Sequence, residues 1–151
     1  MTLEELEKTP PNGLHDAEVK RVAIDYERRT MVVDLAVWVG DMDGPPERRE
    51  AYRYARIDIS GLCFLVMEQP DPKYPFHESD LRIDGCDMSK NLKPDLLSAL
   101  PADSFFRSLW VNEWNAFIHV AARDAKISWI EEALTYRKSK EPIANGQKRI
   151  S

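Results

Sequence analysis

The sequence predicts a mainly β protein whose antiparallel sheet forms a sandwich or a partly closed barrel, with short helices at its periphery. Three observations carry this prediction. About eight segments are rich in β-branched and aromatic residues, and clusters of Gly, Pro, Asn and Asp separate them. Several of these segments alternate apolar and polar residues, as strands do when only one face is packed. Strands do not alternate with long helical patterns, so the rhythm of a nucleotide-binding α/β fold is missing.

The first elements are a short helix and a β-hairpin. Residues 2–8 contain two leucines at helical spacing, and the prolines and the Asn-Gly pair that follow end the helix. A strand is expected over 17–26, where the alternation slips by one residue at Lys20-Arg21 and indicates a β-bulge. The segment 31–39 alternates again after a polar break, so it is expected to complete a hairpin.

The middle of the chain combines two long loops with further strands. Residues 40–50 are expected to lack regular structure, because glycines, prolines and aspartates interrupt them. The next strand is expected over 51–60. The apolar run over 62–68 is short and bounded by turn residues, which favours a strand over a helix. A second loop over 70–79 leads to a short strand over 80–85.

The last third of the chain is expected to be a β-meander. Residues 93–101 are expected to form one or two helical turns between prolines. Residues 104–130 divide into three β-rich pieces, at turns that carry Asn and Asp. A last helix is expected over 131–138. The segment 137–151 is polar and is expected to be a disordered basic tail, which leaves residues 1–136 as one domain.

Composition limits the classes of function. A chain of 151 residues with 43% hydrophobic residues suits a single core. Residues 137–151 carry a net +4, so residues 1–136 carry −9 within a total of −5. Such an acidic body is a poor nucleic-acid binder and suits a partner with a basic surface. No apolar run reaches the roughly 18 residues of a membrane helix, and the acidic N-terminus lacks the features of a signal peptide, which predicts a cytoplasmic protein.

The pair His15-Asp16 is the first candidate for chemistry. A histidine with an orienting carboxylate supplies a general base only if the two side chains meet, and neighbours along a strand point to opposite faces. An Asp between a turn and a strand commonly accepts hydrogen bonds from nearby backbone N–H groups. We therefore expect the pair to anchor the start of a strand, with a catalytic role as the less favoured alternative.

A metal site would have to be assembled across the fold, because no set of ligands has a diagnostic spacing. The candidate ligands are His15, Asp16, Asp41, Asp43, His77, Glu78, Asp80, Asp84 and His119. If a metal binds at all, the set to test is His15, Asp16 and His119, although a histidine in a strand is more often a hydrogen-bonded residue than a ligand. Cys63 and Cys86 lack metal-binding and redox spacings and are expected to be buried thiols. The sequence predicts no cofactor.

Two further places are candidates for binding. Asp41 and Asp43, in the sequence DMDG, resemble the start of a calcium loop but lack its remaining ligands, so a solvated acidic loop is expected. Trp114 stands in the turn NEWN, where it is either folded back as a plug or exposed as a binding anchor. With His15 and Asp16, these three residues complete the predicted binding set.

Two segments of the sequence resemble a known group of proteins. GLHDAEVKRVAIDYERRTMVVDLAVW and WVNEWNAFIHVAARDAKISWI are similar to the first and the closing strands of small bacterial β-proteins, some of which are grouped with immunity proteins of polymorphic toxin systems. The resemblance implies a compact non-enzymatic protein that binds and blocks one partner, such as a toxin domain. It carries over no partner-binding residues, because no family motif defines them.

We therefore expect a cytoplasmic bacterial binding protein that meets a basic protein partner through an acidic face and the loops at 40–50 and 70–80. Two alternatives come from other classes. One is a metal-dependent hydrolase that uses His15, Asp16 and acidic loop residues. The other is a barrel that holds a small apolar ligand among its tryptophans. The oligomeric state stays open, and an exposed edge strand would allow a homodimer.

Overall fold

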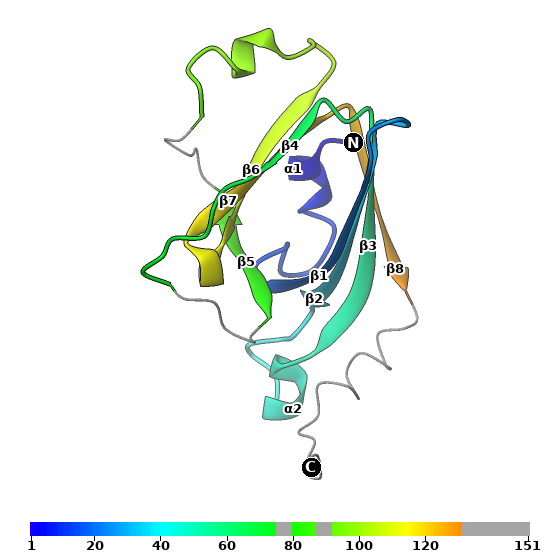
Figure 1. Ribbon diagram of the computed structural model, residues 1–151. Coiled ribbons are helices and arrows are strands. Elements are labelled where there is room, and N and C mark those ends of the chain that lie inside the picture. Colours follow the sequence, from blue (N-terminus) through cyan, green and yellow to red (C-terminus); the bar gives the residue numbers. More distant parts are fainter. Residues whose placement is uncertain (75–79, 87–91, 131–151) are drawn as a thin grey trace, which may run out of the picture.

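The computed structural model describes residues 1–74, 80–86 and 92–130 and confirms the prediction of a mainly β fold (Figure 1). Within these residues, eight antiparallel strands form one sheet in the order β4-β7-β6-β5-β1-β2-β3-β8, and this sheet is not closed. The strands are β1 (Ala17–Asp25), β2 (Thr30–Trp38), β3 (Tyr52–Ser60), β4 (Phe64–Met67), β5 (Leu81–Cys86), β6 (Phe105–Val111), β7 (Ala116–Ala122) and β8 (Asp124–Ile130). The short helices are α1 (Leu3–Leu6), α2 (Pro46–Arg49), η1 (Leu97–Ala99) and η2 (Asn112–Trp114).

The sheet bends so that its inner face encloses one hydrophobic core. Strands β4 to β7 lie on one side of this core and β1, β2, β3 and β8 on the other, with α1 between them (Figure 1). The cavity that remains inside, with Leu35, Ile57 and Val120 among its lining residues, measures about 20 Å³. That volume holds about one water molecule. Side chains therefore fill the interior, and it gives no support to an apolar ligand inside the sheet.

Helix α1 forms where the leucine spacing predicts it. The hydroxyl of Thr2 accepts a hydrogen bond from the backbone N–H of Glu5, and the Glu5 carboxylate accepts one from the N–H of Thr2. This capping box satisfies N–H groups that the first helical turn leaves without partners. Leu3 and Leu6 are fully buried in the core, so the helix covers the opening between the two sides of the sheet.

The first hairpin and the strand beside it agree with the sequence pattern. β1 pairs with β2, and the register shifts between Val19 and Arg21, which confirms the predicted bulge. β3 continues the sheet beside β2. Ala55, Ile57 and Ile59 alternate along β3 and are all buried in the core.

The pairing of β8 differs from the predicted meander. β6 and β7 pair with each other through the turn that contains η2, as expected. β8 instead pairs with β3 on the other side of the core, with Ser60 opposite Asp124. The backbone N–H of Arg123 donates to the carbonyl of Ser60 at 3.1 Å, so a single residue carries the chain across from β7 to β8.

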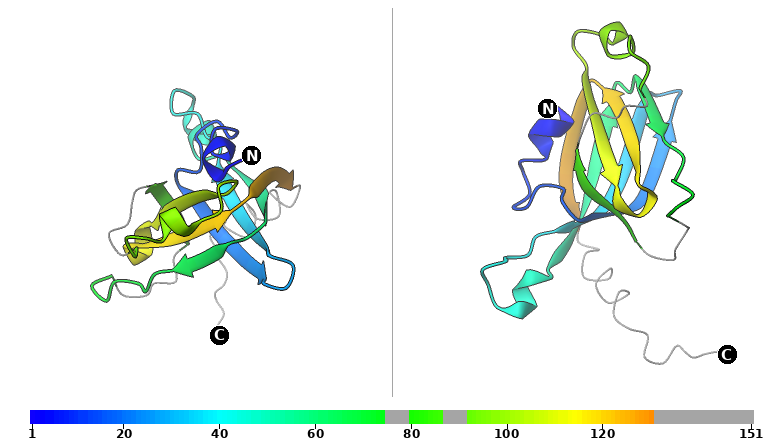
Figure 2. Two further views of the ribbon diagram at one scale, coloured as in Figure 1. Left: turned by 90° about the horizontal axis from the view of Figure 1, so that it is seen from above. Right: turned by 90° about the vertical axis from the view of Figure 1, so that its left-hand side faces the viewer.

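Two other segments differ from the expectation. The loop over 40–50 contains α2, which begins at a proline, a residue favoured in the first helical turn. The hairpin of β2 and β3 extends beyond the end of the sheet and carries α2 there (Figure 2). The strand expected over 62–68 forms as β4, an edge strand on which Val66 and Met67 are exposed. Cys63 just before it is a free thiol of intermediate exposure rather than a buried one.

Some predictions fall outside the described residues. They are the last helix over 131–138, the basic tail over 137–151, residues 75–79 of the second loop with His77 and Glu78, and the burial of the Cys86 side chain. In the part of the chain that the structure describes, no helix has the length and apolar character needed to cross a membrane.

Candidate functional site

The candidate site begins at the turn before β1. The backbone N–H of Asp16 donates to the carbonyl of Ile83 at 2.8 Å, and Ala17 closes the turn with a hydrogen bond to Leu14. Asp16 has a φ of 60°, the left-handed conformation that Asp tolerates better than most residues. His15 and Asp16 therefore do not follow strand geometry. His15 Nε2 lies 3.5 Å from Asp16 Oδ2, so the expectation that the two side chains point apart was wrong.

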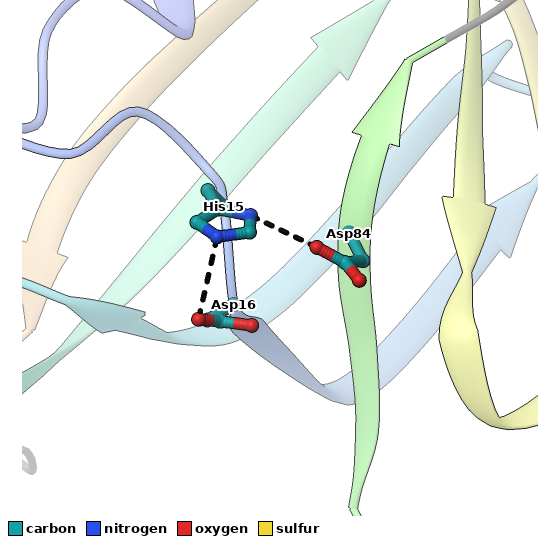
Figure 3. A group of neighbouring side chains, drawn as sticks. All are labelled: His15, Asp16 and Asp84. Atoms are coloured by element: carbon teal, nitrogen blue, oxygen red, sulfur yellow. Dashed lines mark ion pairs between the residues drawn. The ribbon is translucent and has the colours of Figure 1, made fainter.

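A second carboxylate reaches the same imidazole from β5. Ala17 pairs with Ile83, which places Asp84 beside Asp16 at the start of β1. His15 Nδ1 lies 3.0 Å from Asp84 Oδ1. Figure 3 shows the imidazole between the two carboxylates, each facing one ring nitrogen. Asp84, rather than His119, is the third member of the group.

The three side chains are accessible, and their two carboxylates outnumber the single imidazole. The exposed fractions are 56% for His15, 36% for Asp16 and 32% for Asp84. Among the described residues, the ion pairs of both aspartates are with His15 alone. Two carboxylates thus share one imidazole, which supplies at most one positive charge. The ring of Trp38 lies edge-on to that of His15, with the ring centroids 6.4 Å apart.

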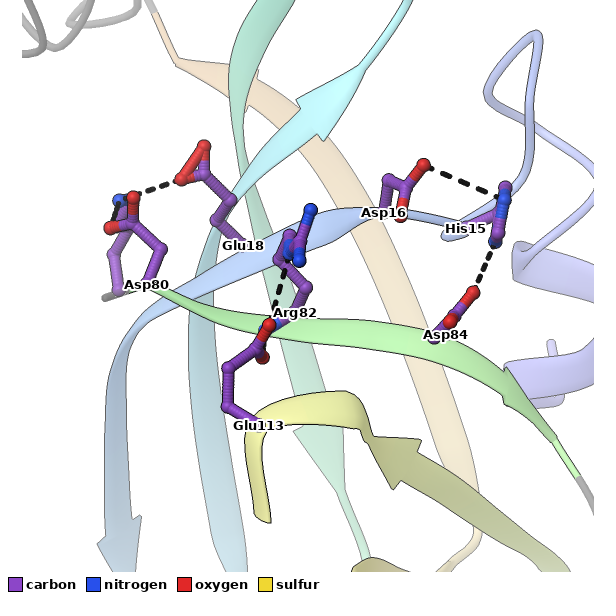
Figure 4. Close-up of polar contacts among 8 residues, drawn as sticks. His15, Asp16, Glu18, Asp80, Arg82, Asp84 and Glu113 are labelled. Atoms are coloured by element: carbon purple, nitrogen blue, oxygen red, sulfur yellow. Dashed lines mark hydrogen bonds and ion pairs between the residues drawn. The ribbon is translucent and has the colours of Figure 1, made fainter. Parts of the chain in front are cut away.

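The other charged side chains on this outer face form ion pairs with side chains of opposite charge (Figure 4). Arg82 of β5 binds Glu113, with Nε 3.0 Å from Oε2, and this hydrogen bond raises the pKa of Arg82 above its ordinary value. Lys20 Nζ lies 3.2 Å from Glu18 Oε2 and 2.6 Å from Asp80 Oδ1. These pairs make a charged surface around the imidazole without adding ligands to it.

Tyr52 is a partly buried tyrosine near this charged surface. Burial raises the pKa of the Tyr52 hydroxyl, and the negative charges of Glu18 and Asp16 raise it further. The Tyr52 phenol therefore stays neutral at neutral pH, where carboxylates are ionised.

The loop of residues 40–50 is tied to the segment that precedes His15. Asn12 Nδ2 donates to the carbonyl of Gly40 at 2.8 Å, and Trp38 Nε1 donates to the carbonyl of Arg49. A Cβ on Gly40 would lie 2.0 Å from that same carbonyl oxygen, so only glycine allows this close approach. The sequence therefore fixes the base of the loop against the turn that carries His15.

The predicted loop aspartates do not join the imidazole. Asp41 Oδ1 accepts a hydrogen bond from the N–H of Asp43, which stabilises the loop itself, and both residues are exposed. Within the described residues, the only group that could hold a metal consists of His15, Asp16 and Asp84. We call these three residues, together with Asp41 and Asp43, the acidic end.

His119 belongs to a different cluster, on the outer face of β7. Its Nδ1 lies 2.7 Å from the hydroxyl of Ser108, and its Nε2 lies 2.7 Å from a carboxylate oxygen of Glu68. Ser, His and Glu form nucleophilic triads in hydrolases. Here His119 is 1% exposed and Ser108 3% exposed, so a substrate does not reach the hydroxyl. The cluster is therefore a structural one, and sequence reasoning missed Ser108 and Glu68.

Trp114 is folded back toward the core. Its ring is partly buried and packs against the core residues, at one wall of a groove of about 190 Å³. The other walls are mainly apolar and include Val19, Met67 and Leu81. The structure thus does not present Trp114 as a freely exposed anchor.

Comparison with protein-family models, with curated protein sequences and with solved structures finds no match. No relative therefore assigns a role to any residue, and the resemblance to immunity proteins stays a prediction.

Proposed function

We propose that this protein is a non-enzymatic binding protein that captures a protein partner with a basic surface, and that the acidic end is its contact surface. The observation that carries this proposal is the pairing of two accessible carboxylates, Asp16 and Asp84, with a single imidazole. Buried or fully paired carboxylates would have little charge left for a partner.

The surroundings of these carboxylates suit a protein interface. Asp41 and Asp43 add negative charge on a loop that stands beyond the end of the sheet and is tied through Asn12 to the segment before His15. The Trp38 ring beside His15 adds the aromatic character that is common in interface centres. Opposite charges across such a surface speed association and reject partners of like charge.

The bacterial immunity role is the more specific form of this proposal. A nuclease toxin presents a basic surface to its nucleic acid, and an acidic protein that covers this surface blocks it. The same logic makes the cytoplasm the expected place of action. Both points rest on charge complementarity and on the resemblance described above.

Partner capture tests the proposal. The full chain is used as bait in a host lysate at low salt, with the product of the neighbouring reading frame included. We expect one basic protein to be retained, and we expect Asp16→Asn/Asp84→Asn to weaken its binding about tenfold or more, because two charges at the contact surface are lost.

The matched control removes two negative charges at another place on the surface. Asp58→Asn/Asp103→Asn removes two carboxylates on exposed positions away from the acidic end, and it should leave capture unchanged. Retention of no protein at low salt, or equal weakening by both double variants, would contradict the proposal.

A further inference from the structure

The ligand types at the acidic end suit a metal ion. One imidazole nitrogen and two carboxylate oxygens, from His15, Asp16 and Asp84, all lie within 4.8 Å of one another. We propose that these three residues bind a divalent transition-metal ion, with Zn²⁺ as the preferred ion. Imidazole and carboxylate are both ligands that zinc accepts, and imidazole favours zinc over Mg²⁺ and Ca²⁺.

The charge of the group supports the proposal independently of the ligand geometry. The ion pairs of Asp16 and Asp84 in the described part of the chain are with His15 alone, so two negative charges face at most one positive charge. Arg82 also interacts electrostatically with Asp16, but its guanidinium is hydrogen-bonded to Glu113. A divalent ion would neutralise both carboxylates at once, which the imidazole does not.

The ligand atoms lie close enough together for a side-chain rotation to bring them around one ion. Donor atoms around tetrahedral zinc lie about 3.3 Å apart when each bond is about 2.0 Å long. His15 Nδ1 lies 3.0 Å from Asp84 Oδ1, whereas the 3.5 Å contact of Asp16 is with the other ring nitrogen, Nε2. With one ligand atom from each residue, the three atoms lie within 4.8 Å of one another. Side chains of intermediate or high exposure can close the remaining gap by rotation, without a shift of the paired strands.

The backbone holds the ligands while one side of the site stays open. Asp16 is fixed by its N–H bond to Ile83, and β1 and β5 pair directly at Ala17. The three ligands come from the turn and one strand, and His15 is more than half exposed. Three protein ligands leave at least one coordination position for water or for a side chain of a partner.

Zinc titration of the purified full chain tests this proposal without any partner. After treatment with a chelator, calorimetric titration with ZnCl₂ should show one site with a dissociation constant in the micromolar range or below. His15→Ala and Asp84→Asn should each weaken binding at least tenfold. Trp38 fluorescence should change on saturation, because its ring contacts that of His15.

The matched control is Asp41→Asn/Asp43→Asn, which removes nearby charge but no proposed ligand, and it should bind zinc as the unchanged protein does. Circular dichroism establishes that each variant is folded. The absence of saturable binding at 100-fold excess over the protein would overturn the proposal, as would zinc affinity that is unaffected by His15→Ala and Asp84→Asn. Bound zinc would offset the negative charge that the proposed function assigns to Asp16 and Asp84, so partner capture is measured on the chelator-treated protein. Zinc binding without capture contradicts the proposed function alone, and capture without zinc binding overturns the metal site alone.

Discussion

Replacement of His119 by alanine is expected to lower the free energy of unfolding by about 3 to 4 kcal/mol. The imidazole is buried between the rings of Phe106 and Phe117, with ring centroids 6.1 and 5.8 Å away. Its removal leaves a cavity there. It also removes the hydrogen-bonding partner of the buried Ser108 hydroxyl and of one Glu68 oxygen. Both effects act in the same direction.

This cluster helps to attach the edge strand β4 to the rest of the sheet. Glu68 follows β4 directly, and its other carboxylate oxygen accepts the N–H of Phe117 at 3.1 Å. With Nε2–H donating to Glu68, Nδ1 of His119 is free to accept the hydroxyl of Ser108, so one tautomer satisfies the whole chain of bonds. The cluster thus connects β4, β7 and β6 across the outer face.

Urea unfolding of the variants measures the effect. Ser108→Ala should cost only about 1 kcal/mol, since it removes one hydrogen bond and little volume. His119→Gln, which keeps a polar group in the space, should lie between these two. A loss below about 1 kcal/mol for His119→Ala would show that the cluster does not stabilise the fold.

Local patterns were sufficient to predict most individual elements. The spacing of Leu3 and Leu6 gave the helix, and the slip in alternation after Val19 gave the bulge. These features depend on residues that are close in sequence, where periodicity and turn chemistry are directly visible. The same holds for the strand expected over 51–60, which forms as β3.

Pairing between distant segments was not predictable in the same way. Alternation shows that 124–130 is a strand, but it does not show which strand lies beside it, and the short connection at Arg123 suggested β7 rather than β3. The candidate site was unpredictable for the same reason. Asp84 meets His15 only because β5 pairs with β1, and no spacing along the chain indicates that pairing.

The rule for neighbouring residues in a strand also fails at His15 and Asp16, because β1 begins only at Ala17. Asp16 stands before β1, in a left-handed conformation, so the rule that neighbours point apart does not hold there. The strand pattern likewise gives no information on Glu68, which lies just beyond the end of β4 and binds His119. The residues at strand ends therefore carry the polar contacts that the strand pattern does not predict.

Replacement of Asp34 by alanine is expected to lower the free energy of unfolding by about 2 to 3 kcal/mol at neutral pH. Its carboxylate is only 8% exposed and lies on β2 between two arginines of the neighbouring strands. Arg56 binds it through two nitrogens, at 2.7 and 3.1 Å, and Arg21 through one, at 3.3 Å. The guanidinium groups are partly exposed and stay hydrated without it, so the loss is smaller than for a fully buried ion pair.

The pH dependence distinguishes this ion pair from simple packing. The hydrogen bond from Arg56 holds the pKa of Asp34 below its ordinary value of 3.8. A carboxylate with a lowered pKa in the folded state stabilises the fold fully above its unfolded pKa, and this contribution is lost as the pH falls through the folded pKa. The difference in stability between the unchanged protein and Asp34→Asn should therefore stay constant from pH 7 to about pH 5 and shrink below about pH 4. Asp58→Asn, on the neighbouring strand, should stay within about 0.5 kcal/mol of the unchanged protein at pH 7. A difference for Asp34→Asn that persists unchanged at pH 2 to 3 would show that shape, and not charge, is what Asp34 contributes.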